Sequence, residues 1–493
     1  MTASLSLPSS LYIGSEWIAM PKDALEPVLN PATEEVIGLA PVAGKTEAEA
    51  AIAAARVAFD KGPWPRMSGK ERAAKLQKFI DAIKAREAAI KHLIQLEAGA
   101  TLAVQYVQFT FPLMHAQHFV DLCARSTVSG LPAEVNPTAS GIKLLGAGVT
   151  VREPVGVVAA ITPYNFPFFM NLAKIVPALA AGNTVILKPS PYTPFEALIL
   201  GEIATEAGLP KGVLNIITGA REVGEMLTTD RRIDLITFTG SDAVGASIQA
   251  QAAPTLKRLL LELGGKSALI VRQDADIGQA VNAGLFNFTW HAGQGCNLNT
   301  RHLVHNSIRN DYVRRLGELT RAIKVGDPAD PATGMGPLIR DAQRRRTESY
   351  VDIALQGGAR LVAGGKRPAD LKRGFFFEPT LFDGVSNRSR IAQEEVFGPI
   401  GVVIGYDKDE EAVALANDSE FGLSGGIFSA DVGRAYEMAL QIRTGEVYLN
   451  GGSGGMSSHA PFGGIKRSGY GREYGIDGLN EYSYAKAIVF HAG

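Results

Sequence analysis

The chain has 493 residues, roughly three times the length of a typical domain, which predicts a multi-domain globular protein with a large core. Lys and Arg (49) nearly balance Asp and Glu (50), for a net charge of −1, and no long block of one sign occurs. This charge pattern argues against binding to nucleic acid or to an anionic membrane. The cysteines are two, Cys123 and Cys296, so neither a disulfide framework nor a cysteine-based zinc site is expected.

The N-terminal segment, MTASLSLPSSLYIG, lacks the basic residues and the apolar stretch of a secretory signal. No run of 18 apolar residues occurs in the chain. Together with the low cysteine content, these features predict a soluble protein of a reducing compartment, the cytoplasm.

Serine or threonine followed three residues later by glutamate is a capping-box pattern that begins helices. Thr46 with Glu49, and Ser68 with Glu71, each precede apolar residues at helical spacing. We expect the second helix to be one long helix that ends near Gly99, because it has a continuous apolar stripe. That stripe consists of Leu76, Phe79, Ile80, Ile83, Ile90, Leu93 and Ile94.

From residue 155 the pattern changes to short apolar runs separated by helical segments. The strands of a first series are predicted at 155–161, 184–188, 214–219, 235–240 and 267–271. The second series has strands at 400–406, 426–429 and 446–450, and helices near 409–417 and 431–443. Strands that alternate with helices form a parallel sheet covered on both faces, so the fold class is α/β with two such units.

Two segments are predicted to be β arms outside either unit. One is the turn-rich stretch 131–150, and the other is the tail from about 477, which ends in YSYAKAIVF. Exposed strands are commonly paired across a subunit interface, because an unpaired edge is a liability. We therefore expect a homodimer or a homotetramer.

Two glycine-rich loops are open to more than one interpretation. Gly240-Ser-Asp-Ala-Val-Gly245 lies between a predicted strand and a helix, where its N–H groups could hold a pyrophosphate or form an ordinary helix cap. Ala246 stands where a P-loop needs lysine, so hydrolysis of a nucleoside triphosphate is not expected. The segment 451–455 matches G-x-S-x-G, but no helix is predicted after it, so a flexible loop is the better interpretation.

Three side chains could carry chemistry or could simply be structural. Cys296 lies in a polar turn, HAGQGCN, which favours a reactive thiol over a core cysteine. Cys123 lies in a helix-like stretch and fits a core position. Glu262 lies between three leucines and two glycines, where burial would raise its pKa and suit a general base, and an ordinary ion pair is an equal alternative.

Seven motifs, in the same order and spacing, resemble the NAD(P)-dependent aldehyde dehydrogenase superfamily. They are PYNFP (163–167), LKPS (187–190), FTGS (238–241), LELGGK (261–266), GQGC (293–296), EEVFGP (394–399) and APFGGIKRSGYGRE (460–473). The resemblance extends from residue 30 to the terminal strand. It implies a Rossmann-type cofactor domain at 1–130 and 151–258, a catalytic α/β domain at 259–473 and a β oligomerisation arm at 131–150 and 474–493.

The same resemblance implies roles for individual residues. Cys296 would attack the aldehyde carbonyl, and Asn165 and the Cys296 N–H would donate to the resulting oxyanion. Glu262 would activate the water that hydrolyses the thioester. Lys174 and Glu473 match a buried pair behind this base, which either orients it and relays its proton or is only structural.

The implied cofactor is NAD or NADP and the implied substrate is an aldehyde, with water as the second substrate and no metal. The implied cofactor positions are Ile161, Thr162, Pro163, Lys188, Gly240, Ser241, Gly245, Leu263, Glu395 and Phe397. The implied aldehyde tunnel is aromatic and consists of Phe166, Phe169, Phe286, Trp290 and Phe462. With no arginine in this set, semialdehydes of dicarboxylic acids are not expected.

Three departures from the family pattern stand out. Tyr164 replaces the usual tryptophan, and Pro191 replaces the glutamate of many NAD-preferring relatives. The stretch after the cysteine reads NLNTR, where the family usually has a small residue and then Gly-Ser-Arg. The expected reaction is oxidation of an apolar aldehyde (aliphatic, aromatic or terpenoid) to the acid. Release to coenzyme A is the alternative, which the presence of Glu262 disfavours. A non-catalytic use of the fold is a third hypothesis, and the joint presence of Cys296, Glu262, Asn165 and Lys188 argues against it.

Overall fold

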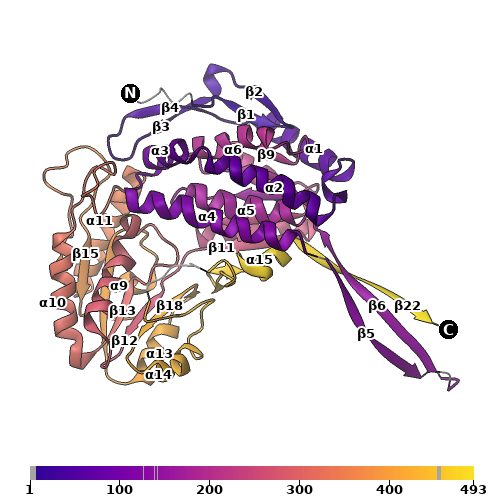
Figure 1. The fold of residues 1–493 in the computed structure, drawn as a ribbon. Helices are drawn as coiled ribbons and strands as arrows, with labels where there is room; N and C mark the ends of the chain where they lie inside the picture. The colour runs from indigo at the N-terminus through magenta and orange to yellow at the C-terminus, as the bar shows by residue number, and fades with distance from the viewer. Residues whose placement is uncertain (1–6, 126, 138, 142, 452–456, 493) are drawn as a thin grey trace.

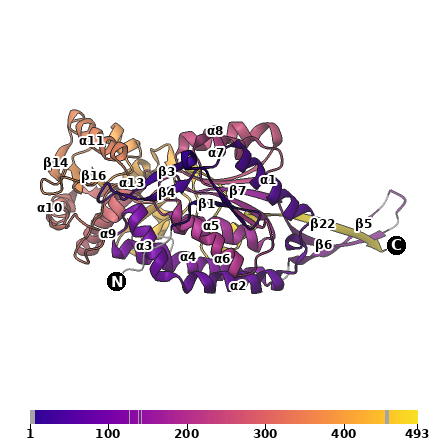
Figure 2. The same ribbon diagram turned by 90° about the horizontal axis from the view of Figure 1, so that it is seen from above.

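The computed structural model describes residues 7–125, 127–137, 139–141, 143–451 and 457–492. It has an α/β fold in which two sheets, each covered by helices, lie side by side and a β arm extends away from them (Figures 1 and 2). No helix in the described part of the chain is both long and apolar enough to cross a membrane.

The first sheet has the strand order β2-β1-β9-β8-β7-β10-β11-β21. Its five central strands, β9 to β11 in this order, run parallel, and antiparallel strands close both edges. The strands are β1 (Ser10–Ile13), β2 (Glu16–Ala19), β7 (Val157–Ile161), β8 (Thr184–Lys188), β9 (Leu214–Ile216), β10 (Leu235–Thr239), β11 (Arg258–Glu262) and β21 (Gly469–Tyr470). The predicted strands of the first series up to residue 240 are thereby confirmed.

Helices cover both faces of this sheet, as Figure 2 shows. One face carries α1 (Lys45–Asp60), α7 (Arg221–Thr229) and α8 (Asp242–Ala252). The other carries α2 (Gly69–Lys84), α3 (Glu87–Ala98), α4 (Leu102–Cys123), α5 (Pro167–Ala180) and α6 (Phe195–Glu206). Each layer packs its own apolar core against the sheet, which is why the central strands are apolar on both sides.

Two predictions about the early helices need correction. The Ser68–Glu71 capping box is present, with the Glu71 N–H donating to Ser68 Oγ over 3.3 Å. The Thr46–Glu49 box is wrong, because α1 is capped at Gly44, whose N–H donates to Glu47 Oε2 over 2.8 Å. The single long helix is also wrong: the chain breaks at 85–86 into α2 and α3. The apolar stripe runs on across the break, and all seven of its side chains are buried.

The second sheet has the strand order β14-β15-β16-β13-β12-β18-β19. Its strands are β12 (Ala268–Val271), β13 (Arg301–His305), β14 (Arg360–Ala363), β15 (Thr380–Asp383), β16 (Ile400–Tyr406), β18 (Gly425–Phe428) and β19 (Tyr448–Leu449). Its helices are α9 (Ile277–Thr289), α10 (Asn306–Ala322), α11 (Asp341–Gln356), α12 (Arg390–Gln393), α13 (Asp409–Asn417) and α14 (Val432–Ala439). The strand at 268–271 was expected in the first series, and that expectation is wrong, because β12 pairs with β13 and β18.

The first sheet continues through β11 to Glu262, so the chain passes to the second sheet between Glu262 and Ala268. Smaller elements lie around the two units: β3 (Leu25–Leu29), β4 (Val36–Pro41), β17 (Phe421–Gly422), β20 (Ile465–Lys466), α15 (Gly475–Glu481), and the short helices η1 (Lys22–Ala24), η2 (Trp64–Arg66), η3 (Ala253–Thr255) and η4 (Trp290–Gly293). The assignment of cofactor binding to one unit and catalysis to the other stays a prediction.

The two predicted β arms form one three-stranded antiparallel sheet, β22-β6-β5, which extends from the body in Figure 1. Its strands are β5 (Val128–Pro137), β6 (Lys143–Pro154) and β22 (Ser483–Ala492). The tail thus has a partner within its own chain, in a register that places Tyr484 opposite Glu153. The outer edges of β5 and β22 are the ones left without a paired strand among the described residues.

Candidate active site

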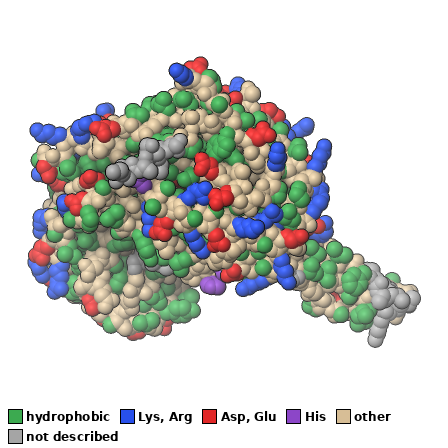
Figure 3. Space-filling model, turned by 45° about the horizontal axis from the view of Figure 1, so that its top comes forward, with side chains coloured by type: hydrophobic (Ala, Val, Ile, Leu, Met, Phe, Trp, Pro, Cys, Tyr) green, Lys and Arg blue, Asp and Glu red, His purple; other side chains and the backbone are tan. Residues whose placement is uncertain are grey.

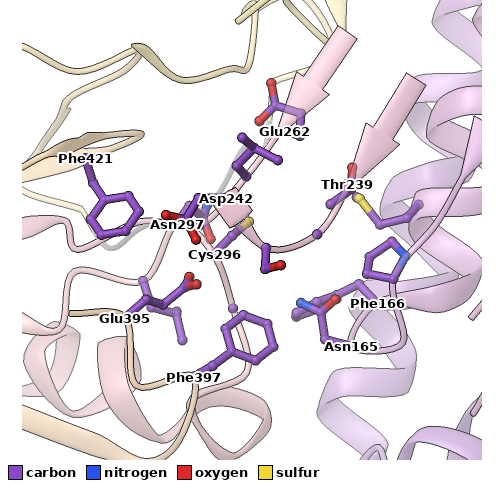
Figure 4. A pocket seen from close by; sticks show the side chains of 18 of the residues that line it. Asn165, Phe166, Thr239, Asp242, Glu262, Cys296, Asn297, Glu395, Phe397 and Phe421 are labelled. Carbon is purple, nitrogen blue, oxygen red and sulfur yellow. The ribbon is translucent and has the colours of Figure 1, made fainter. Parts of the chain in front are cut away.

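A cavity of about 1710 Å³ opens where the parallel strands of the first sheet end, and residues of both units line it. In open α/β sheets, ligands bind at this carboxyl edge of the strands. Figure 4 shows Cys296 near the centre of this cavity, with Glu262 at the end of one strand and Asn165 across from it. The three residues predicted to do the chemistry therefore meet in one place, although they come from three separate segments.

Cys296 is half-buried in the loop that follows η4, a segment in which His291 and Ala292 both have positive φ. Burial raises the pKa of its thiol well above the usual value, and the carboxyl groups of Glu262 and Glu395 raise the pKa further. The thiol therefore needs a base to take its proton before it can act as a nucleophile.

Glu262 ends β11 with its side chain buried and with no hydrogen-bond partner for either carboxyl oxygen among the described residues. Burial raises the pKa of this carboxyl well above its usual value, Glu473 raises it further, and Lys174 lowers it. A Cβ on Gly463 would lie 2.8 Å from Glu262 Oε1, so the absence of a side chain there leaves room for the carboxyl. A carboxyl with a raised pKa holds a proton more tightly than an ordinary glutamate does, which suits a general base.

Lys174 and Glu473 form a fully buried ion pair behind Glu262. Lys174 lies on α5, and its Nζ is 2.7 Å from Glu473 Oε1 and 3.0 Å from Thr237 Oγ1. Glu473 is placed by a β-bridge with Phe462. Because Glu473 also lines the cavity, the pair connects the interior of the first unit to the surroundings of Glu262.

Asn165 lies just before α5 and is held from two sides. Its Nδ2 donates to the Gln294 carbonyl over 2.7 Å, and its own carbonyl accepts from Gln108 Nε2 over 3.2 Å. Gln294 is fully buried and also accepts from the Ile339 N–H over 3.1 Å. An amide nitrogen carries two hydrogens, so one remains to donate to an oxyanion beside Cys296.

Most of the residues predicted to hold the cofactor lie at the carboxyl ends of the same strands, and Glu395 and Phe397 come from the second unit. Gly240 and Ser241 form the turn between β10 and α8, and Ser241 Oγ caps α8 by accepting from the Val244 N–H. A Cβ on Gly245 would lie 2.7 Å from the Leu263 side chain, so a glycine lets α8 approach this strand end closely. Free N–H groups at a helix start are suited to phosphate.

Glu395 faces this turn from the second unit. Its Oε1 accepts from the Gly265 N–H over 3.0 Å, and burial raises its pKa to about 7. A Cβ on Gly264 would lie 2.3 Å from Glu395 Oε2, so two glycines form a cradle for the carboxyl. Lys188 ends β8, where burial lowers its pKa to about 8. A glycine turn, a lysine and a carboxylate together fit the phosphate and ribose groups of a dinucleotide.

Not all predicted cofactor residues line the cavity. Those that do are Pro163, Gly240, Ser241, Leu263, Glu395 and Phe397. The others lie behind this lining and are Ile161, Thr162, Lys188 and Gly245. Thr162, for example, is buried, and its hydroxyl donates to Asn171 Oδ1 over 2.6 Å.

The five predicted tunnel residues all line the cavity. Phe286 and Trp290 pack with ring centroids 4.7 Å apart, and Phe462 and Phe169 each contact the ring of Tyr474 at 5.8 and 6.1 Å. Four arginines also line the cavity, but none belongs to this aromatic set.

Sequence reasoning missed several residues that shape the site. Tyr474 lines the cavity, has φ 61° and stacks on His115 of α4 with centroids 4.0 Å apart. Gln108, also on α4, holds the loop of Asn165. Position next to Glu473 is the one signal that could have indicated Tyr474. Nothing in the periodicity of α4 marks Gln108 or His115 as neighbours of the site.

The sequence offers two other possible nucleophiles, Cys123 and the serine of the G-x-S-x-G segment. Cys123 is buried at the end of α4, and its thiol donates to the carbonyls of Gly69 and Ala180 over 3.2 Å each, as predicted for a core cysteine. The G-x-S-x-G segment at 451–455 lies, beyond Gly451, outside the described residues. Over the ranges that the structure covers, no three His, Cys, Asp or Glu side chains are placed to hold a metal ion.

Comparison with known proteins places this geometry in a family. The aldehyde dehydrogenase family matches residues 17–488. The betaine aldehyde dehydrogenase of Bacillus subtilis is 38% identical over 98% of this chain and 97% of its own length, and the geranial dehydrogenase of Castellaniella defragrans is 38% identical over 97% and 98%. A crystal structure of Staphylococcus aureus betaine aldehyde dehydrogenase with NAD+ superimposes with a TM-score of 0.94, at 38% identity over 98% of this chain and 95% of that one. The chain belongs to the aldehyde dehydrogenase family and is an aldehyde dehydrogenase.

Proposed function

We propose that this enzyme oxidises an apolar aldehyde to its carboxylic acid with NAD+ or NADP+, through a thioester on Cys296 that water hydrolyses. The observation that supports this most is that Cys296, Glu262 and Asn165 line one cavity together with the five aromatic residues of the predicted tunnel. The NAD+ in the related Staphylococcus aureus structure supports the choice of cofactor. A cytoplasmic location of this enzyme stays a prediction. Two related aminoaldehyde dehydrogenases of Pisum sativum are peroxisomal.

In the proposed mechanism, the Cys296 thiol gives its proton to a water molecule in the cavity. The resulting thiolate bonds to the aldehyde carbon, and the carbonyl oxygen becomes an oxyanion. Asn165 Nδ2 and the Cys296 N–H donate to this oxyanion. When bound, the oxidised nicotinamide ring accepts the hydride that leaves this carbon. Gly240, Ser241 and Glu395 would hold the cofactor, with Lys188 behind them.

Glu262 acts in the second half of the reaction. It takes a proton from water, and the resulting hydroxide attacks the thioester carbonyl and expels the Cys296 thiolate. Its raised pKa suits this proton transfer. A base that stands within the cavity favours hydrolysis over release of the acyl group to coenzyme A.

The substrate class is tested with a spectrophotometric panel of aliphatic, aromatic, terpenoid and cationic aldehydes, with and without coenzyme A. We expect the highest kcat/KM for apolar aldehydes of medium size, because the predicted tunnel residues are aromatic and include no arginine to bind a carboxylate. We expect no requirement for coenzyme A, because Glu262 favours hydrolysis. Betaine aldehyde is the decisive comparison, since aromatic rings also attract quaternary ammonium groups. A higher kcat/KM for betaine aldehyde than for every apolar aldehyde would contradict the proposal.

Cofactor tolerance gives a prediction of its own. Pro191 is exposed three residues after Lys188, where a glutamate would repel the extra phosphate of NADP+. We expect both cofactors to be used, with a preference for NAD+ below about a thousandfold, or about 4 kcal/mol. Pro191→Glu should lower kcat/KM for NADP+ about tenfold and leave the reaction with NAD+ nearly unchanged. A preference for NAD+ beyond a thousandfold in the unmodified enzyme would refute the prediction.

We also propose that the arm joins subunits into a homodimer or a tetramer of dimers. Apolar side chains are exposed along it, and Figure 3 shows hydrophobic surface on the arm. They include Val128, Leu131, Val135, Leu145, Tyr484, Ile488, Val489 and Phe490. An apolar strand edge of this kind is usually covered by another chain.

Deleting residues 485–493 should weaken this association. The deletion removes most of β22 but keeps Tyr482, whose carbonyl accepts from Asn183 Nδ2 over 2.9 Å in the body of the protein. Light scattering should then report a smaller species than for the full chain at equal concentration. A full chain that is active and strictly monomeric would overturn the proposal.

A further inference from the structure

Arg340 differs from the other arginines that line the cavity. Arg390 pairs with Glu394 over 2.8 Å, and Arg467 pairs with Asp242. Arg340 has no carboxylate within ion-pair distance among the residues that the structure describes, and its side chain is exposed at the cavity. An arginine lining a ligand cavity with no internal counter-charge is suited to an anionic ligand.

The remaining arginine, Arg346, is already engaged. Its guanidinium donates to the Glu395 carbonyl over 2.7 Å, to the Val396 carbonyl over 3.3 Å and to the Tyr350 hydroxyl over 3.2 Å. Arg346 therefore fixes the segment that carries Glu395. Among the cavity arginines, this leaves Arg340 with the most unused hydrogen-bond donors in the described part of the chain.

Arg340 is nevertheless held in place, by a contact that crosses between the two units. It lies at the start of α11 in the second unit, and its guanidinium donates to the hydroxyl of Tyr192, in the loop between β8 and α6 of the first unit. The same guanidinium lies 4.7 Å from the centre of the Tyr192 ring. Of its five N–H donors, this hydrogen bond uses one.

Aromatic contacts place this pair next to the cofactor part of the cavity. The Tyr192 ring is 6.0 Å from that of Tyr164, which lines the cavity beside Asn165. The Tyr164 ring is 6.1 Å from that of Phe397, which also lines the cavity. Arg340 thus lies on the side of the cavity lined by Tyr164 and Phe397, and Phe397 is one of the residues predicted to hold the cofactor.

We propose that Arg340 binds the pyrophosphate of the dinucleotide cofactor, opposite the Gly240–Gly245 turn, and that Tyr192 positions its guanidinium for this contact. The proposal rests on the proposed use of NAD+ or NADP+. The pyrophosphate is the anionic group that both cofactors share, and a planar guanidinium matches its oxygens. The α8 start supplies N–H donors on one side of this group, and Arg340 supplies the positive charge on the other.

The test is calorimetric binding of ADP-ribose, NAD+ and NADP+ to the full chain without aldehyde. Arg340→Gln should raise Kd about tenfold for all three ligands, because each contains the pyrophosphate. Arg340→Lys should recover part of the lost affinity, since lysine keeps the positive charge but lacks the planar guanidinium. Arg345→Gln is the matched control, because Arg345 lies on the same helix, is exposed and pairs with Asp341.

Each deviation from this pattern has a distinct meaning. Weaker binding of NADP+ alone would assign Arg340 to the 2′-phosphate. Weaker binding of NAD+ and NADP+ with unchanged binding of ADP-ribose would assign it to the nicotinamide half. Either result, or unchanged Kd values, overturns the proposal. Thermal unfolding of Arg340→Gln and Arg340→Lys verifies that both variants fold. The binding test contains no aldehyde. Its outcome therefore does not depend on whether the proposed apolar substrate class is right.

Discussion

Replacing Cys296 with alanine is expected to abolish aldehyde oxidation, whereas replacing Glu262 with glutamine is expected to leave a single turnover. Without the thiol, no covalent adduct forms and no hydride is released. Without the carboxylate, the adduct forms and cofactor is reduced once, and the enzyme then stalls at the thioester. Rapid mixing should show a burst of reduced cofactor close to one per active site in Glu262→Gln and none in Cys296→Ala.

The steady-state rate of Glu262→Gln should fall by a factor of about 10² to 10⁴, the usual contribution of a general base. Cys123→Ser is the matched control. Cys123 is the other cysteine of the chain, it is buried, and its thiol donates to two carbonyls that a serine hydroxyl could also reach. Its activity should stay close to that of the unmodified enzyme. Complete loss of the burst in both active-site variants would contradict the assigned roles.

The pH dependence of hydrolysis follows from the raised pKa of Glu262. The carboxyl acts as a base only when it has lost its proton, so the rate of thioester hydrolysis should fall as pH drops below this raised pKa. In Glu262→Gln, the residual rate should lose this acidic limb. Single-turnover measurements of acid release across pH would show it.

Replacing Lys174 with methionine is expected to destabilise the fold by about 3–5 kcal/mol. The change leaves the carboxylate of Glu473 buried without its cation, which costs far more than the pair itself contributes. It should also raise the pKa of Glu262, because Lys174 lowers that pKa in the intact protein. Denaturant unfolding measures the first effect, and the pH profile of hydrolysis measures the second.

The double variant Lys174→Met, Glu473→Leu separates a structural pair from a functional one. Removing both charges should restore most of the lost stability, because no buried charge is then left without a partner. If the pair also serves the base, thioester hydrolysis should be slower in this stable double variant than in the unmodified enzyme. Full activity there would mean that the pair is only structural. An unchanged stability of Lys174→Met alone would contradict the burial that the prediction rests on.

The local sequence was sufficient to predict much of the architecture and part of the site. Apolar runs between helical segments predicted β7, β8, β9, β10 and β16, because strands buried on both faces must be apolar throughout. The polar turn around Cys296 and the apolar run before Glu262 indicated their unusual environments directly. Their roles came from resemblance to the family, since no spacing within the chain relates the two residues.

Tertiary packing decided what these patterns leave open. The run at 268–271 would suit the centre of either sheet, so its place was fixed by the strands available beside it. The apolar stripe of α2 and α3 has the same period across the break at 85–86, so periodicity alone could not reveal two helices. Contacts such as Tyr192 with Arg340, or Gln108 with Asn165, join residues far apart in the chain. Such contacts depend on how the elements pack, and periodicity within one element carries no information about its distant neighbours.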